Sequence, residues 1–214
     1  MNSVLILSGG IGKRMGIDIP KQFLRIKNKF ILEYSLDIFY KNKEIDEIII
    51  VCNKNYINKI DYLSEKFKIV EAGKNRTESS FNGLKNCNSK CINVIIHDAA
   101  RPFCPLNIVE EGLSFLNEYD AAIPILSVND SVIDNNNNRI NYLKRDNVKI
   151  IQTPQFFRYK NIFSAYSSNN NVYSDDLSLL LGYNSQSKIK LFKGSKDNFK
   201  ITTYNDYQFA KKIV

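Results

Sequence analysis

Apolar and polar residues alternate along most of the chain in blocks that predict a strand followed by a helix. Compact β-branched runs that are apolar throughout are typical of buried strands, and apolar residues at helical spacing indicate amphipathic helices. The predicted strands are 4–7, 47–52, 68–71, 91–97, 121–127, 149–152 (closing at 153–157), 188–192 and 199–201, and the predicted helices are 30–39, 56–67, 76–86, 159–167, 174–181 and 203–213. Strands that are hydrophobic on both faces and alternate with helices predict an α/β fold, a doubly wound, mostly parallel sheet with helices on each side.

One stretch interrupts this alternation. A polar turn at 134–139 separates short apolar runs at 131–133 and 139–143, which is the pattern of a β-hairpin. A projecting hairpin cannot bury its apolar face alone, so it either folds back on the body or is covered by a second subunit. A chain of 214 residues fits one domain. We therefore expect a single domain over 1–214 with a β-arm at 127–149.

A glycine-rich loop at 8–12 follows the first predicted strand, and cations follow the loop. Glycines allow backbone N–H groups to approach a ligand closely, and the nearby Arg14 and Lys21 favour an anion. A Walker loop would need glycine at Leu7 and a hydroxyl residue at Arg14, and a dinucleotide fingerprint would need glycine at Met15. The loop therefore indicates a phosphate site of neither kind.

Two further segments end predicted strands with small or polar residues, namely the turn at Gly73 and the run 97–102. In an open α/β sheet, ligands bind outside the carboxyl ends of the strands. The pattern therefore predicts that the glycine loop and these two segments line one site.

Composition narrows the class of protein. The net charge is +8, but the lysines are scattered, so the charge by itself does not favour nucleic acid. No apolar run approaches the roughly 20 residues of a membrane span, and no signal peptide is evident, so we expect a cytoplasmic protein without a membrane partner. The four cysteines form no CxxC pair and there is one histidine, which favours reduced thiols and no metal site built from side chains.

Seven segments together resemble the 2-C-methyl-D-erythritol 4-phosphate cytidylyltransferase family, in order and nearly in spacing. They are LSGGIGKRMG, PKQF, AGKNRTESSFNGL, HDAARPF, QTPQFF, YSDD and DNFKITT, and the resemblance covers essentially the whole chain. It implies transfer of CMP from CTP to 2-C-methyl-D-erythritol 4-phosphate in non-mevalonate isoprenoid biosynthesis, with release of pyrophosphate. It also implies a Rossmann-like nucleotidyltransferase fold, a homodimer formed through the β-arm, and Mg²⁺ held mainly by the CTP phosphates.

The resemblance also implies roles for individual residues. Arg14 and Lys21 are expected to stabilise the transition state on the triphosphate, with Lys200 as a third cation near the α-phosphate. The residues expected to bind CTP are Ser8, Gly9, Gly10, Gly12, Gly73, Ser79, Asp98 and Ala99, and those expected to bind the acceptor phosphate are Arg101, Ser131, Arg145, Thr153 and Ser174. Arg145 would come from the arm of the partner subunit.

Each assignment has a purely structural alternative. Asp98 could cap the following turn and pair with Arg101, Lys200 could lie on a solvated face, and Thr153 could simply end a strand. The single histidine, His97, is expected to be a packed residue rather than a catalyst. The run 174–176 has the chemistry of a helix N-cap followed by first-turn acids.

The acceptor is less well defined by the sequence than the CMP transfer. The loop begins with Leu7 and Ser8 where the family commonly has Pro-Ala, which is closer to the sister family of ribitol-5-phosphate cytidylyltransferases. The pairs 99–100 (Ala-Ala) and 156–157 (Phe-Phe) favour methylerythritol phosphate. The sequence also leaves open a uridylyl- or guanylyltransferase that acts on a hexose phosphate, and a non-catalytic nucleotide- or RNA-binding protein.

Overall fold

The computed structural model describes residues 1–12, 15–16, 19–136, 139–169 and 171–214. Over these residues an eight-stranded sheet has the order β10-β7-β11-β6-β1-β4-β5, with β12 also paired to β7. Its strands are β1 (Asn2–Ser8), β4 (Glu47–Cys52), β5 (Lys68–Glu71), β6 (Asn93–Asp98), β7 (Ala121–Ser127), β10 (Lys149–Ile151), β11 (Gln155–Arg158) and β12 (Ile189–Lys193). Strands β10 and β11 run antiparallel to their neighbours, and the remaining pairs are parallel. The predicted α/β class with a mostly parallel sheet is confirmed.

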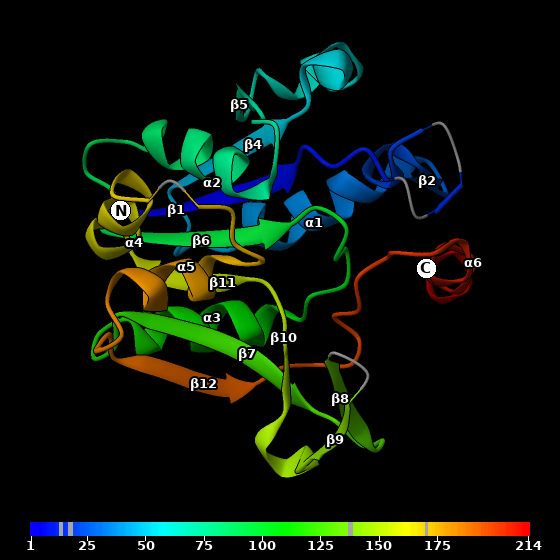
Figure 1. Ribbon diagram of the computed structural model, residues 1–214. Coiled ribbons are helices and arrows are strands. Elements are labelled where there is room, and N and C mark those ends of the chain that lie inside the picture. The colour runs from blue at the N-terminus through cyan, green and yellow to red at the C-terminus, as the bar shows by residue number, and fades with distance from the viewer. Residues whose placement is uncertain (13–14, 17–18, 137–138, 170) are drawn as a thin grey trace.

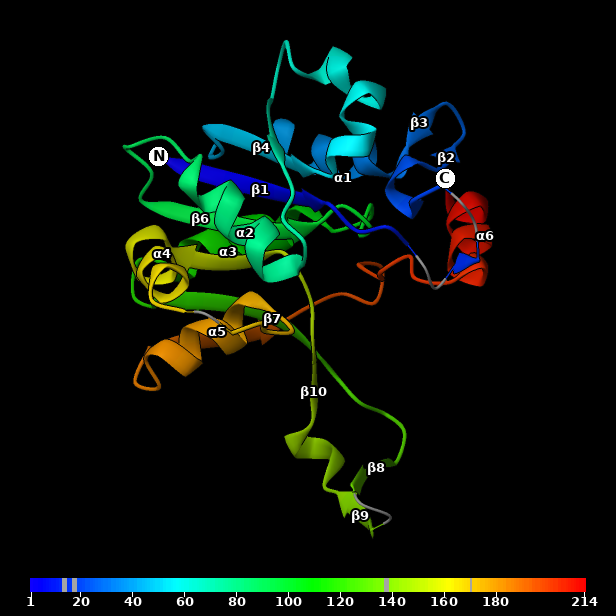
Figure 2. The same ribbon diagram turned by 45° about the horizontal axis from the view of Figure 1, so that its top comes forward.

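Helices cover both faces of the sheet (Figures 1 and 2). One face carries α1 (Ile31–Tyr40) and α3 (Leu106–Phe115), and the other carries α2 (Arg76–Lys85), α4 (Tyr159–Ser167) and α5 (Asp176–Tyr183). Alternate residues of β1 enter different cores: Val4 packs with the first group and Leu5 with the second. Since side chains alternate across a strand, a strand covered on both faces is apolar throughout.

The C-terminal helix α6 (Tyr204–Ile213) lies beside a small hairpin of β2 (Arg25–Ile26) and β3 (Lys29–Phe30) (Figure 2). Ile201, just before α6, packs there with Ile26 and Ile31 in a third, smaller cluster. This packing fixes the segment before α6, which carries Lys200, against the N-terminal part of the chain. None of the described helices combines the length and the apolar character that a membrane crossing needs.

The predicted hairpin is present as β8 (Val132–Asn136) and β9 (Arg139–Leu143), paired in a separate two-stranded sheet. It projects away from the body in both views (Figures 1 and 2). Ile140 and Tyr142 are 64% and 80% exposed, so the hairpin does not fold back to bury its apolar side chains. Of the two arrangements that the sequence allowed, this excludes the first.

Several local expectations were wrong or incomplete. The segment 56–67 is not an α-helix but two short 3-10 helices, Lys54–Lys59 and Asp61–Leu63, because polar side chains such as Asn53 and Ser64 bond nearby backbone groups instead. The segment 199–201 is not a strand, and the Ile201 N–H donates one backbone hydrogen bond to the Ala100 carbonyl. Helix α3 was not predicted, and 149–157 forms two strands rather than one.

Candidate active site

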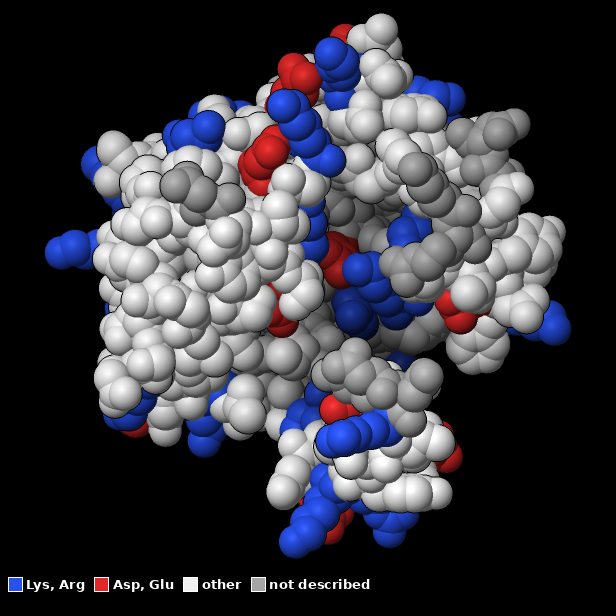
Figure 3. Space-filling view, viewed as in Figure 1, with Lys and Arg blue, Asp and Glu red and all other residues white. Residues whose placement is uncertain are grey.

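A cavity of about 520 Å³ lies at the carboxyl ends of β1, β4 and β6. In the space-filling view it is a hollow bordered by basic side chains, with acidic atoms at its floor (Figure 3). The glycine loop, the turn at Gly73 and the segment after β6 all line it, as the sequence predicted. The predicted residues that line it are Gly9, Gly10, Gly12, Lys21, Gly73, Ser79, Asp98, Ala99 and Lys200.

One side-chain amide, that of Gln22, fixes the glycine loop by hydrogen bonds. Gln22 donates from Nε2 to the carbonyl oxygens of Ser8 and Gly10, at 2.7 Å each. Gln22 and Lys21 belong to the same short 3-10 helix, Lys21–Phe23, so the contact that fixes the loop also places the lysine beside it. Gly12 has a φ of +70°, a conformation that glycine adopts without strain. The Pro-Lys-Gln step thus joins the loop and the cation into one rigid unit.

The turn at Gly73, which lines the cavity, is tightly packed. A Cβ on Gly9 would lie 2.6 Å from the Cβ of Ala72, and a Cβ on Gly73 would overlap Glu78. Ser79 accepts a hydrogen bond from the Gly73 N–H through Oγ (3.1 Å) and donates to the Asn75 carbonyl (2.7 Å). Hydrogen bonds therefore fix the turn, and neither glycine position has room for a side chain.

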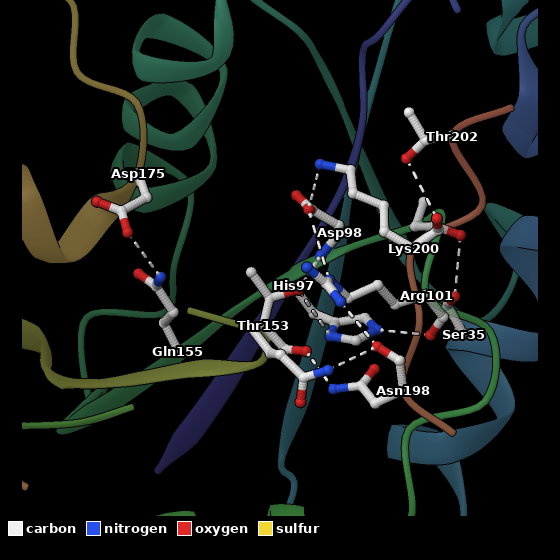
Figure 4. A network of polar contacts seen from close by, with 12 residues as sticks. Ser35, His97, Asp98, Arg101, Thr153, Gln155, Asp175, Asn198, Lys200 and Thr202 are labelled. Carbon is white, nitrogen blue, oxygen red and sulfur yellow. Dashed lines mark hydrogen bonds and ion pairs between the residues drawn. The ribbon is translucent and has the colours of Figure 1, made fainter. Parts of the chain in front are cut away.

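Asp98 lies at the end of β6, where cations from three segments meet, and Figure 4 shows two of them, Lys200 and Arg101. Its Oδ2 is 2.7 Å from Lys200 Nζ and 3.9 Å from Arg101 Nε, and its Oδ1 is 3.8 Å from Arg76 Nε. Burial raises the pKa of Asp98, but the positive charges of Lys200, Arg76 and Arg101 outweigh it and hold this pKa well below its ordinary value. Asp98 is consequently a carboxylate that organises cations rather than a general acid, and it does not act as a simple turn cap.

A buried polar network lies directly under Asp98 (Figure 4). Thr153 accepts from the Asp98 N–H through Oγ1 (3.0 Å), and its carbonyl accepts from Asn198 Nδ2 (2.8 Å). The Asn198 carbonyl in turn accepts from Arg101 Nη1 (2.7 Å) and Gln152 Nε2 (3.1 Å). Asn198 is fully buried two residues before Lys200, so the network fixes the segment that presents this lysine to the cavity.

A model of the 2-C-methyl-D-erythritol 4-phosphate cytidylyltransferase family matches residues 3–214. The chain is 38% identical over 224 residues to the enzyme of that name from Clostridium botulinum, covering all of this chain and 97% of the relative. It is 35% identical to the Clostridioides difficile enzyme of that name, covering all of this chain and 94% of the relative.

Solved structures agree with the sequence matches. The 4-diphosphocytidyl-2C-methyl-D-erythritol synthase of Anaerococcus prevotii superposes with a TM-score of 0.88 at 30% identity, over all of this chain and 95% of that one. The Francisella tularensis 2-C-methyl-D-erythritol 4-phosphate cytidylyltransferase gives a TM-score of 0.85 at 29% identity, over all of this chain and 99% of that one. The chain belongs to this cytidylyltransferase family.

The residues that the family resemblance assigned to catalysis and to CTP binding are largely brought together, with two exceptions. Ser8 is buried at the end of β1 and does not line the cavity in the described part of the chain. Arg14 lies outside the described residues, so its role stays a prediction. Lys200 lies on the cavity rather than on a solvated face.

The residues assigned to the acceptor phosphate are dispersed in a single chain of this cytidylyltransferase. Arg101 and Thr153 are buried in the network under Asp98 and do not line the cavity in the described part of the chain, so Thr153 is more than a strand end. Ser131 and Arg145 are exposed at the arm, where Arg145 Nη1 donates to the Asn129 carbonyl (3.2 Å), and Ser174 is exposed before α5. The roles of all five residues toward the acceptor stay predictions.

Sequence reasoning missed one functional candidate, Arg76, which lines the cavity and pairs with Asp176 at 2.6 Å. Both residues lie in segments that carry the family resemblance, but no local pattern indicates that positions 100 residues apart form a pair.

The N-cap of α5 is Asp175, not Ser174, since the Asp175 side chain accepts from the Ser178 N–H (2.8 Å). Asp176 is fully buried rather than a solvated first-turn acid.

The cavity offers little to a metal by itself. Asp98 is the one acidic residue that lines it in the described part of the chain, and cations already surround this carboxylate. Nor do the described residues include a group of three acidic, histidine or cysteine side chains placed to hold a metal ion. This donor set would suit only a magnesium ion that takes most of its ligands from phosphates and water.

Proposed function

We propose that this protein transfers CMP from CTP to 2-C-methyl-D-erythritol 4-phosphate, forming CDP-methylerythritol and pyrophosphate in non-mevalonate isoprenoid biosynthesis. The observation that carries the proposal is the cavity in which the glycine loop, Lys21 and Lys200 meet, in a chain that matches this enzyme family over residues 3–214. The Clostridium botulinum and Clostridioides difficile relatives both bear the name of this activity.

The reaction needs charge control more than proton transfer. A phosphate monoester has a second pKa of about 6, so near pH 7 the acceptor phosphate is already a dianion and a nucleophile. Its oxygen forms a bond to the α-phosphorus of CTP while the bond from that phosphorus to the bridging oxygen breaks, and pyrophosphate leaves with the electron pair. Two anions must come together, and negative charge grows at the α-phosphate, so fixed cations and positioning supply the catalysis.

The cations divide this work. Lys21, held beside the glycine loop, would bind the triphosphate together with Arg14, and Lys200 would stabilise charge at the α-phosphate. Backbone N–H groups of Gly9 and Gly10 would contact the phosphates as well. The tight turn at Gly73 would read the edge of a pyrimidine and leave too little room for a purine, which supports CTP as the nucleotide.

The acceptor side and the metal extend the same proposal. Ser131 and Arg145 would reach the acceptor phosphate from the arm of a partner subunit, because in one chain the arm projects away from the body. The exposed Ile140 and Tyr142 support a homodimer through this arm.

Magnesium, when bound with CTP, would offset negative charge on the triphosphate. Asp98 is the residue that would hold it or its water ligands.

Pyrophosphate release tests the function directly. We expect release with CTP and 2-C-methyl-D-erythritol 4-phosphate, and little with ribitol 5-phosphate as acceptor or with UTP as donor. Release only with ribitol 5-phosphate would assign the protein to the sister activity, and no release with any pair would favour a non-catalytic nucleotide binder.

A matched pair of lysine variants tests the site in the same assay. Lys200→Ala should lower kcat by roughly 10²- to 10³-fold, the usual cost of removing one group that stabilises transition-state charge. Lys196→Ala, an exposed lysine of the same segment, should retain wild-type turnover. Equal turnover in the two variants would contradict the role of Lys200.

A further inference from the structure

The pair formed by Arg76 and Asp176 is not explained by local helix physics. Arg76 is the first residue of α2, where the helix dipole favours an anion over a cation. Asp176 is fully buried, and its two carboxylate oxygens accept from Arg76 Nη2 (2.6 Å) and from the Tyr166 hydroxyl (2.5 Å). A buried ion pair is weak evidence for stability, since an apolar replacement is often at least as stable. Its geometry therefore needs another reason.

That reason lies in a second contact of the same guanidinium. Arg76 Nη2 faces Asp176, whereas its Nε lies 3.8 Å from Asp98 Oδ1, at the wall of the cavity. Asp98 Oδ2 contacts Lys200 Nζ at 2.7 Å. Charges thus alternate from Asp176 through Arg76 and Asp98 to Lys200, linking α5, α2, the end of β6 and the segment before α6.

We propose that Asp176 is a positioning residue for cytidylyl transfer, acting through Arg76 and Asp98 to hold Lys200 at the α-phosphate. Asp176 is fully buried and is not among the described residues that line the cavity, so it is not itself a catalytic residue. Its carboxylate shares the charge of Arg76, which leaves the Oδ2 side of Asp98 to Lys200. Without that carboxylate, Arg76 would turn fully to Asp98 and compete with Lys200. This inference rests on the proposed role of Lys200.

The decisive variant is Asp176→Asn, which keeps the shape of the side chain and removes its charge. We expect kcat to fall at least tenfold, with the KM for CTP changed less than threefold, because Lys200 acts on charge that develops in the transition state. Asp175→Asn is the matched control: it is the adjacent acid and caps α5, and asparagine caps a helix equally well. This control should keep the wild-type kcat.

A double-mutant cycle separates positioning from a general structural effect. If Asp176 acts through Lys200, then adding Asp176→Asn to Lys200→Ala should lower kcat by less than a further twofold. Losses that multiply in the double variant, or a folded Asp176→Asn enzyme with wild-type kcat, would overturn the positioning role and leave the proposed function intact. A wild-type enzyme that releases no pyrophosphate would overturn both proposals.

A second variant covers the case in which Asp176→Asn fails to fold. Arg76→Lys keeps the positive charge, but a single ammonium group cannot reach both Asp176 and Asp98 as the separate Nη2 and Nε nitrogens of the guanidinium do. It should show the same fall in kcat and the same absence of a further loss in the Lys200→Ala background. A thermal melt of each variant confirms folding, and a wild-type kcat in folded Arg76→Lys would contradict the inference.

Discussion

Lowering the pH from 7.5 to 5 should destabilise this protein through one residue, His97. It is the only histidine of the chain and is fully buried, and its Nε2 lies 3.0 Å from the Arg101 carbonyl oxygen. A carbonyl only accepts hydrogen bonds, so Nε2 carries the proton and Nδ1 faces the Thr153 hydroxyl at 3.3 Å. A second proton would place a charge inside the core beneath Asp98.

The size of the effect follows from the pKa. Burial lowers the pKa of His97 from its ordinary 6.5 to about 4. Between these values the unfolded chain binds a proton that the folded chain does not, so stability is full above pH 6.5 and is lost as the pH falls toward 4. At about 1.4 kcal/mol per pH unit, the loss between pH 6.5 and pH 5 is about 2 kcal/mol.

Urea unfolding followed by circular dichroism at pH 7.5 and pH 5 measures this loss. The control is His97→Gln, which cannot titrate and whose amide can still donate to the Arg101 carbonyl. The wild-type protein should lose about 2 kcal/mol more than the variant on acidification. An equal loss in both proteins would show that other groups carry the pH dependence and would refute the reasoning.

Three further predictions concern catalysis and packing. Lys21→Ala should lower kcat by orders of magnitude with a modest change in CTP affinity, and an unchanged rate would remove Lys21 from its role. Arg145→Ala should raise the KM for the acceptor phosphate and leave the KM for CTP unchanged. An effect confined to the KM for CTP would contradict the assignment of Arg145. Gly112→Ala should cost about 2 kcal/mol in a thermal or urea melt because a Cβ there overlaps the buried ring of Phe156. Gly182→Ala, which meets only the far end of a tyrosine side chain, should stay within about 0.5 kcal/mol of wild type.

The parts of the fold predictable from the sequence are those set by local patterns. The strand β4 occupies the predicted residues because a strand buried on both faces leaves an uninterrupted apolar run. The short edge strand β5 also lies at its predicted residues. Helix α4 also matches its predicted range, since apolar residues recur there at helical spacing. The position of the site was also predictable from the sequence. Parallel strands bring their carboxyl ends to one edge of the sheet, so loops far apart in sequence line one cavity.

What local patterns do not contain is the pairing of distant polar groups. Arg76 meets Asp176, and Asn198 meets Thr153, only after the sheet and its helices have packed. Lys200 lies between apolar residues, as in a strand, but its segment does not pair with the sheet. The buried hydrogen bonds of Asn198 fix this segment instead. Arg101 is likewise buried and donates to the Asn198 carbonyl, a contact between distant segments, and its role toward the acceptor phosphate stays a prediction.

The arrangement around Asp98 explains how several cations can line one cavity without forcing it apart. Lys21, Lys74, Arg76 and Lys200 line it, and among the residues that the structure describes only Asp98 opposes them. Because Asp98 meets Lys200 through Oδ2 and Arg76 through Oδ1, one carboxylate fixes two cations on opposite sides. Under the proposed function, a triphosphate in this cavity would meet donors already in place, so little reorganisation would be needed when charge grows at the α-phosphate. The same carboxylate that offsets repulsion among these cations thereby orients them for the reaction.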